Sequence, residues 1–423
     1  MNTEEITMRE IRKLNETHID AYTDIAFNAY PSFKDFTEEA MNKYKETVAY
    51  IMNNDSAVTF YGMFEDEKLI AVMRLFDFKM NCFGKIVPAS GLGFLGVHLM
   101  HKKEKAAKAM VEFYEKTYRD KGIPIGALLP FRPDFYKKMG YGIGSKMNQY
   151  RLPPNRMPLY SGKNDLRYVA KNEFDMLLKC HERVVAKTHG MMMKIGDEIR
   201  NLTSDPYNRI VGSYDENGNI NGYIIYKFQN AKAGNYTVTN IYVKELIYEN
   251  TDVLRKFLGF LRKQDDEIDL IIFNTEDEYF YYLFDNPLND SLNYIPYGYI
   301  ESNTQAVGVM YKLFDIKKAF EQCSHRNYGN SNLNVRFLIS DELSKNVNEI
   351  IVNFKDGKAH TNAKKYDVTA KIRTSDFSSL FLASVSIMGL YNLGLIKLDK
   401  EEYLDELDRT FYYAQKPVCY TDF

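Results

Sequence analysis

The order of the expected elements constrains the fold of this chain most, because one order occurs twice in succession. Residues 7–129 show alternating and helical patterns that predict a strand, a helix, a hairpin, a further strand, a helix and a last strand. Residues 166–274 follow the same order, and the DENGN turn at 215–219 is the clearest hairpin signal. The repeat rests on this pattern alone, since no residues align between the two stretches. It predicts a duplicated mixed-sheet architecture.

A third unit with another pattern follows the repeat. It combines strand-like runs with an apolar helical region and a last helix, at residues 304–314, 333–339, 348–354, 358–362, 376–396 and 401–411. A chain of 423 residues is long enough for several domains. We therefore expect an α+β fold class and domains at 1–152, 153–302 and 303–423, with Pro153 and Pro154 as the first linker.

One apolar run, residues 380–396, could be mistaken for a membrane span. It is shorter than the roughly 20 residues that a spanning helix needs, and it carries Ser384, Ser386 and Asn392. We interpret it as a buried helix and turn, and we expect no membrane partner.

Composition excludes several classes of function. Lys and Arg number 55 and Asp and Glu number 57, so a net charge of −2 gives no reason to expect a nucleic-acid partner. The four cysteines form no CxxC pair, which argues against structural zinc and favours a reducing compartment. The first residues show no signal-peptide pattern, so we expect a cytoplasmic protein without a metal.

The stretch 91–144 is the most informative for chemistry. A strand leads into a helix that begins with MHKKEKAAKAM, and a strand that ends at a helix N-terminus offers backbone N–H groups to an anion. Lys102, Lys103 and Lys105 add positive charge there, which suits a pyrophosphate. A solvated first turn of an exposed helix would show the same lysines, so both interpretations stay open.

In this stretch the sequence resembles the GNAT superfamily of acetyl-CoA-dependent N-acetyltransferases. The family pattern R/Q-x-x-G-x-G/A at the helix start is in register with Lys102, Lys105 and Ala107. The sequence departs from the pattern because Lys105 replaces the glycine and Lys102 replaces the leading Arg or Gln. A Cβ at residue 105 could crowd an approaching phosphate.

Three further features resemble the Eis-like branch of that superfamily, which includes aminoglycoside N-acetyltransferases. They are FYKKMGYG at 135–142, PSFKDF at 31–36, and Phe423 as the last residue. The resemblance implies a catalytic GNAT domain, a second GNAT-like domain without the cofactor motif, and a sterol-carrier-protein-like domain. It also implies a hexamer.

The resemblance further implies roles for particular residues. Tyr136 matches the general acid, and the carboxylate of Phe423 matches the base. The acetyl-CoA contacts correspond to Leu95, Gly96, Val97, Lys102, Lys103, Glu104, Lys105, Ala106, Ala107, Lys108 and Phe131, and the substrate contacts to Phe33, Asp35 and Phe94. By composition alone, Tyr136 would be a packing residue, Phe423 a frayed terminus and Asp35 an acid at a helix start.

These residue types suit acetyl transfer to an amine. An alkylammonium has a pKa of about 10.4 and must lose a proton before it can attack a thioester, so a nearby carboxylate can serve as base. We therefore expect direct attack in a ternary complex on aminoglycoside-like amines, polyamines or Lys side chains. The alternative is a weak or inactive GNAT-like protein that binds an apolar or CoA-type ligand. His98 and His101, at the strand-to-helix junction, are interpreted as incidental.

Overall fold

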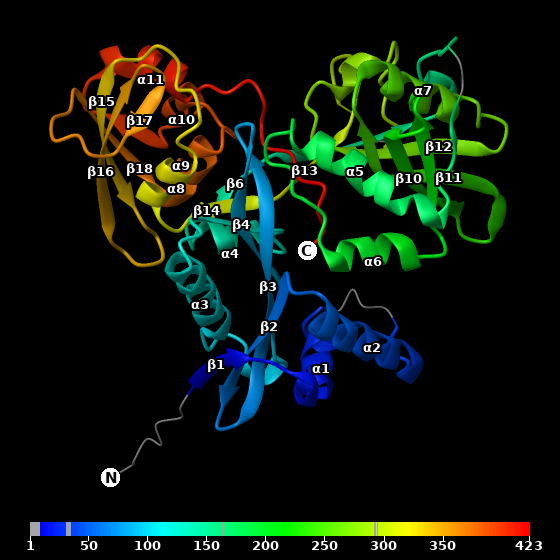
Figure 1. The fold of residues 1–423 in the computed structure, drawn as a ribbon, viewed down its shortest axis with the longest axis horizontal. Helices are drawn as coiled ribbons and strands as arrows, with labels where there is room; N and C mark the ends of the chain where they lie inside the picture. Colours follow the sequence, from blue (N-terminus) through cyan, green and yellow to red (C-terminus); the bar gives the residue numbers. More distant parts are fainter. Residues whose placement is uncertain (1–8, 31–34, 163–164, 292, 294) are drawn as a thin grey trace.

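The computed structural model shows three sheets in three lobes (Figure 1). It describes residues 9–30, 35–162, 165–291, 293 and 295–423. The α+β fold class is confirmed, with two mixed sheets followed by a third, smaller one. Among the described residues, no helix has both the length and the apolar character that a membrane crossing requires.

The first sheet has the order β1-β2-β3-β4-β5-β14-β6. Its strands are β1 (Arg9–Lys13), β2 (Val58–Glu65), β3 (Lys68–Cys82), β4 (Lys85–Val97), β5 (Ile125–Leu128), β14 (Met310–Leu313) and β6 (Gly142–Ile143), and its helices are α1 (Ile19–Ala29), α2 (Glu38–Asn54), α3 (Ala106–Asp120) and α4 (Pro133–Lys137). Side chains of β3 alternate between the two faces. Val72 and Phe76 join the core under α1, whereas Met73 and Leu75 join the core under α3.

The second sheet has the order β13-β7-β12-β11-β10-β9-β8. Its strands are β13 (Thr304–Val307), β7 (Lys146–Leu152), β12 (Ile268–Thr275), β11 (Asn235–Tyr248), β10 (Ile220–Lys232), β9 (Arg209–Tyr214) and β8 (Arg167–Tyr168), with α5 (Phe174–Val185), α6 (Gly196–Ser204) and α7 (Thr251–Arg262). β11 is parallel to β12, as β4 is to β5, and a helix joins each pair. The expected repetition of the element order is therefore present in space.

The third sheet has the order β17-β16-β15-β18-β19. Its elements are α8 (Ile316–Gln322), β15 (Leu333–Ser340), β16 (Val347–Lys355), β17 (Lys358–His360), β18 (Val368–Arg373), α9 (Thr374–Phe381), α10 (Ile387–Asn392), β19 (Ile396–Leu398) and α11 (Leu404–Phe411). The apolar run at 380–396 spans the end of α9, α10 and the first residue of β19. It is buried only in part: Leu380, Ile387 and Leu390 are buried, whereas residues 392–394 are exposed.

Sheet membership differs from the expected domain limits at two places. The segment 304–313 was expected to begin the third domain, but β13 pairs with β7 of the second sheet and β14 lies between β5 and β6 of the first. β7, expected in the first domain, belongs to the second sheet. All four residues of β14 are buried, so its apolar pattern reflects an interior position in the first sheet.

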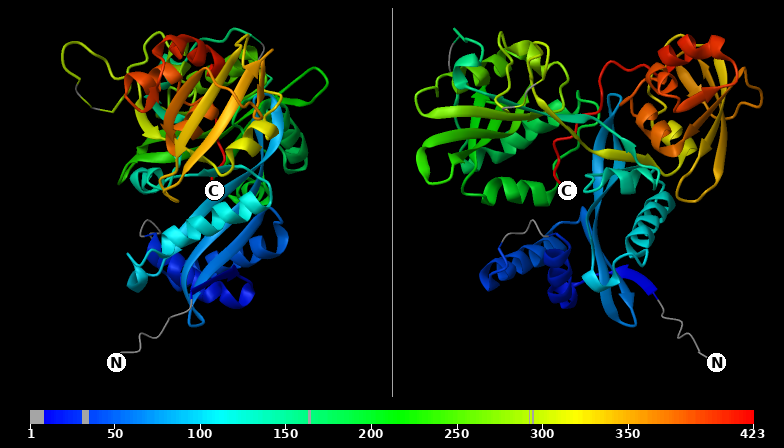
Figure 2. Two further views of the ribbon diagram at one scale, coloured as in Figure 1. Left: turned by 90° about the vertical axis from the view of Figure 1, so that its left-hand side faces the viewer. Right: turned by 180° about the vertical axis from the view of Figure 1, so that it is seen from behind.

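The last twelve residues, 412–423, form an extended segment that we call the terminal strap. It leaves the third domain after α11, runs beside the second domain and ends at the first (Figures 1 and 2). Val418 N donates to His189 O at 2.8 Å, and Cys419 N donates to Glu276 Oε2 at 2.6 Å. These bonds fix the strap against the second domain.

Candidate active site

The edge of β4 is the backbone feature around which the candidate site is built. β5 pairs with β4 only at Ser90, Gly91 and Leu92, whereas β4 continues to Val97. Between the pairs of Gly93 with Arg74 and Gly96 with Val72, β4 has one residue more than β3, and Phe94 there has φ of 52°. This bulge gives β4 a local bend in the segment that has no β5 partner.

The turn into α3 follows this edge. Lys103 and Lys105 adopt left-handed conformations, with φ of 68° and 65°, so the helix expected from Lys102 begins only at Ala106. Lys105 is the N-cap residue and its side chain makes no capping hydrogen bond. The first turn of α3 therefore offers backbone N–H groups and the positive end of its dipole beside three exposed lysines.

Glu104 is the one acid within this turn, and its carboxylate is bound by neighbouring basic side chains. Its carboxylate lies 3.2 Å from His101 Nδ1 and accepts a hydrogen bond from Arg9 NH2 at 2.6 Å. These contacts, the one with His101 first, lower the pKa of Glu104. Glu65, His101 and Glu104 have the spacing of metal ligands, with their ligand atoms within 4.8 Å of one another. Because Arg9 already binds both carboxylates, we interpret the group as an ion-pair cluster.

The corresponding junction of the second sheet is built differently. Asn250 is the N-cap of α7, and its side chain accepts a hydrogen bond from Val253 N at 3.1 Å. A side chain thus occupies the helix start there, where α3 leaves it uncapped.

Tyr136 lies on α4 and is 8% exposed. Its ring packs against Phe135 and Tyr141, at centroid distances of 5.1 and 6.0 Å, and burial raises the pKa of Tyr136 to about 12. Burial likewise raises the pKa of Tyr30, and the nearby Tyr136 adds to that shift. Tyr30 in turn donates its hydroxyl proton to Leu95 O at 2.9 Å, so Tyr136 lies near the β4 edge.

Phe423 ends the terminal strap against the first sheet. Its ring lies edge-on to Phe76 and Phe78, with centroids 5.7 and 4.9 Å away. Two glycines of β4 make room for it: a Cβ on Gly91 would lie 3.1 Å from the Phe423 ring, and one on Gly93 would lie 2.7 Å from its carboxyl carbon. The terminal carboxyl group therefore lies over β4, immediately before the bulge.

An arginine that sequence reasoning missed lies beside this position. Arg74, on the same face of β3 as Phe76, donates to the hydroxyls of Tyr22 at 2.9 Å and Tyr44 at 3.1 Å. Its guanidinium carbon lies 4.8 Å from the centre of the Phe94 ring. A charged residue inside the apolar strand LIAVMRLFDF is the signal that could have marked it.

The expected substrate residues are placed unevenly. Phe94 lies between Arg74 and Tyr30, whose ring centroid is 4.8 Å away. Asp35 is exposed and accepts a hydrogen bond from Thr37 N at 2.9 Å. Hydrogen bonding to the side chain and then to the backbone of Thr37 lowers the pKa of Asp35, as for an acid before a helix. Phe33 lies outside the described residues.

Phe131, expected among the acetyl-CoA contacts, follows β5. It is 75% exposed, and its ring centroid lies 6.2 Å from that of Tyr30. It therefore belongs to the rim of the same site.

Three parts of the chain match known domain families. Residues 10–144 match one family described as acetyltransferase (GNAT) domain, and residues 192–299 match another with the same description. Residues 316–420 match the sterol carrier protein domain.

Among curated proteins, an uncharacterized N-acetyltransferase of Streptomyces avermitilis is 23% identical over 210 residues, which cover 48% of this chain and 49% of the relative. The chain thus matches about half the length of that relative.

Solved structures share the whole fold. A GCN5-related N-acetyltransferase from Anabaena variabilis has a TM-score of 0.80 at 16% identity, over 98% of this chain and 100% of the other. Eis1 from Mycobacterium abscessus has a TM-score of 0.74 at 17% identity, also over 98% and 100%. By its domain content, therefore, the chain carries two regions that match acetyltransferase (GNAT) domains, followed by one that matches the sterol carrier protein domain.

Proposed function

We propose that the first domain transfers an acetyl group from acetyl-CoA to a primary amine, by direct attack in a ternary complex. Four features on and next to β4 support this proposal: the edge beyond Leu92, the uncapped start of α3, the buried Tyr136 and the carboxyl group of Phe423. In the proposed reaction they would serve as an anion site, a proton donor and a proton acceptor.

The residues present fit acetyl-CoA. The backbone of Leu95, Gly96 and Val97 would bind the pantetheine, and the turn from Lys102 to Lys108 would bind the pyrophosphate. Lys105 departs from the family glycine, yet its φ of 65° is the conformation that glycine adopts most easily, so the turn keeps its shape. Phe131 would give an apolar rim where some family members offer a serine.

Two residues would move protons in the reaction. The carboxylate of Phe423 would hold the substrate ammonium and accept its proton, directly or through water. Tyr136 would protonate the departing thiolate, because its raised pKa keeps the hydroxyl protonated at neutral pH. A backbone N–H near Leu95 would stabilise negative charge on the thioester oxygen.

The substrate class is proposed from the resemblance to the Eis-like branch, which the likeness in fold to Eis1 accompanies. We propose an aminoglycoside-like amine, a polyamine or a Lys side chain as acceptor. A cytoplasmic hexamer is part of the same proposal, as a symmetric assembly is common among soluble oligomers.

The test is release of free CoA from acetyl-CoA by the full chain, with kanamycin, spermidine and a Lys-containing peptide as separate acceptors. We expect release that depends on one of these amines and an acetylated amine as product. If acetyl-CoA binds but no acceptor raises CoA release above hydrolysis, the chain is instead a GNAT-like binding protein.

A further inference from the structure

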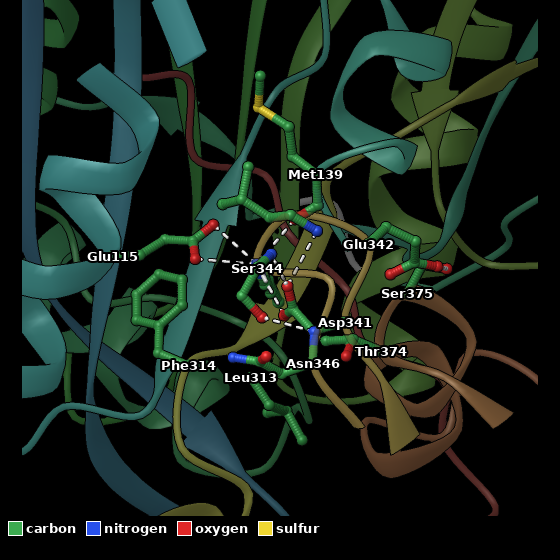
Figure 3. Close-up of polar contacts among 12 residues, drawn as sticks. Glu115, Met139, Leu313, Phe314, Asp341, Glu342, Ser344, Asn346, Thr374 and Ser375 are labelled. Carbon is green, nitrogen blue, oxygen red and sulfur yellow. Dashed lines mark hydrogen bonds and ion pairs between the residues drawn. The ribbon is translucent and has the colours of Figure 1, made fainter. Parts of the chain in front are cut away.

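Lys312 is a buried cation at which three parts of the chain meet. It lies on β14, inside the first sheet, and is 1% exposed. Its ammonium group donates to both carboxylate oxygens of Glu115, at 3.0 and 2.9 Å, and to Met139 O at 2.7 Å, and it lies 3.4 Å from Asp341 Oδ2. Figure 3 shows Glu115, Met139 and Asp341 converging on this point from separate elements.

Each partner belongs to a different part of the molecule. Glu115 lies on α3, the helix that begins after the turn of Lys102, Lys103 and Lys105. Met139 follows α4, the helix that carries Tyr136. Asp341 follows β15 of the third sheet, where the backbone N–H groups of Leu343 and Ser344 hold its other oxygen at 2.9 and 2.6 Å.

A short chain of hydrogen bonds connects Lys312 to Tyr136. Lys312 donates to the carbonyl of Met139, and the amide of Met139 donates to the carbonyl of Tyr136 at 2.9 Å. Gly140 allows the approach, because it has φ of +88° and a Cβ there would lie 3.0 Å from Lys312 Cε. The glycine after Met139 in the FYKKMGYG motif thus has a structural reason that involves Lys312.

Side-chain packing between α3 and the third domain is incomplete. A cavity of about 1010 Å³ lies between them, lined by Glu112, Glu115, Asp341 and Leu343 among others. A buried ion pair is weak evidence for stability, because desolvation offsets the attraction between the charges, but it can define a unique geometry. The contacts of Lys312 with Glu115 and Asp341 therefore define how α3 and the third domain are placed relative to β14.

We propose that Lys312 is a positioning residue for acetyl transfer. Through Met139 it holds Tyr136, through Glu115 it holds α3, and through Asp341 it connects both to the third domain. The assignment rests on the proposed function, since it gives Lys312 its role through Tyr136. It also gives the third domain a part in a reaction that takes place in the first.

The first variant is Lys312→Met, which keeps the aliphatic stem and removes the ammonium. We expect kcat to fall about 10-fold or more, as for a displaced catalytic group, while the KM values for acetyl-CoA and amine stay within about twofold. In a Tyr136→Phe background the same change should lower kcat no further. Full multiplication of the two losses, or an unchanged kcat in Lys312→Met, would overturn the proposal.

A second variant controls for Glu115, one of the two carboxylates that lose their cation in Lys312→Met. Lys312→Met with Glu115→Met removes the charges of both residues, while Asp341 keeps its hydrogen bonds from Leu343 N and Ser344 N. The chain should then fold and still show the low kcat. Recovery of the wild-type kcat would mean that the unpaired Glu115 caused the loss, and Lys312 would not be a positioning residue. Asp341→Asn tests the connection to the third domain and should lower kcat in the same direction; no change would remove the third domain from the proposal.

A readout without turnover separates this proposal from the proposed function. Amide hydrogen exchange should become faster at residues 133–141 in Lys312→Met and stay unchanged in β9 and β10. If wild-type chain acetylates no amine, the proposed function fails while this measurement still decides whether Lys312 holds the Tyr136 segment. Unchanged exchange at 133–141 would contradict the positioning role.

Discussion

The carboxyl carbon of Phe423 lies 2.7 Å from the position that a Cβ on Gly93 would occupy. β4 therefore accepts the end of the terminal strap only because residue 93 has no side chain. The same position lies beside the Phe76 ring, whose Cε2 would be 2.9 Å from that Cβ.

Gly93→Ala should displace the terminal carboxyl group and leave the fold intact. We expect kcat to fall by about 100-fold, the effect of a misplacement of about 1 Å in an active site. Steady-state kinetics with circular dichroism as the folding check would measure it. Gly389→Ala, on α10 far along the chain in the third domain, is the matched control and should leave kcat unchanged.

Changes at Phe423 itself should follow the position of the carboxylate. Deleting Phe423, or adding a few residues after it, should lower turnover without unfolding the chain, because both move the charge away from Gly93. Phe423→Leu keeps the carboxylate and much of the apolar contact, so it should be the mildest change. Full turnover on a cationic amine after a C-terminal extension would show that another group is the base.

Tyr136→Phe should fold and bind acetyl-CoA normally, because only the hydroxyl is lost from a packed ring. Turnover should fall about 10²- to 10⁴-fold, the usual contribution of general acid catalysis. Since burial raises the pKa of Tyr136 to about 12, the hydroxyl stays protonated below that pH. The wild-type kcat should therefore show no loss from this group between pH 7 and pH 10 (about two units below the raised pKa), and a threefold or smaller effect of the substitution would make Tyr136 structural.

Each chain should bind one equivalent of acetyl-CoA. The start of α3 is uncapped and flanked by exposed lysines, whereas Asn250 caps α7 in the second domain. Calorimetry should give a stoichiometry near one, and Lys103→Glu should weaken binding and flatten its dependence on salt. Lys171→Glu, an exposed lysine of the second domain, is the control and should change neither; two equivalents per chain would contradict the assignment.

Glu276 should make the free energy of unfolding depend on pH. Burial raises its pKa from 4.5 to about 8, against the hydrogen bond from Cys419 N. Between these pH values the folded chain binds more protons than the unfolded chain, so this group's contribution to stability is full below about pH 4.5 and is lost as pH rises to about 8.

Glu276→Gln should remove this dependence, because the amide cannot ionise and its oxygen can still accept from Cys419 N. At pH 9 the variant should be more stable than wild type by on the order of 1 kcal/mol or more, since one pKa unit corresponds to about 1.4 kcal/mol. Urea titrations at pH 5 and pH 9 would measure the difference. Asp269→Asn changes an exposed acid on β12, the strand that Glu276 follows, and should leave the difference unchanged. Equal pH profiles for Glu276→Gln and wild type would refute the prediction.

The sequence predicted those elements whose structure depends on residues close together in the chain. The hairpin of β2 and β3, the DENGN turn and the helices within 374–392 were predictable because each depends on short-range periodicity and turn residues. The start of α3 was not, since Lys103 and Lys105 take left-handed conformations that lysine adopts rarely.

Long-range pairing is what the sequence pattern could not supply. The sequence of a four-residue strand such as β14 does not indicate which strands it will pair with, so its place between β5 and β6 was not predicted. Arg74 and Lys312 were missed for a related reason: their partners, Tyr44 and Glu115, are 30 and 197 residues away in the chain. The resemblance to a known family supplied Tyr136 and Phe423, which composition would have dismissed.

The interior place of β14 sets an order of events during synthesis. The first sheet cannot be completed until residue 313 has left the ribosome, because β14 lies between β5 and β6 and pairs with both. Until then the emerging N-terminal region carries two strands that present unpaired edges, a state open to wrong pairing and aggregation. A nascent chain halted before residue 304 should therefore need a chaperone, and one halted well past residue 313 should not.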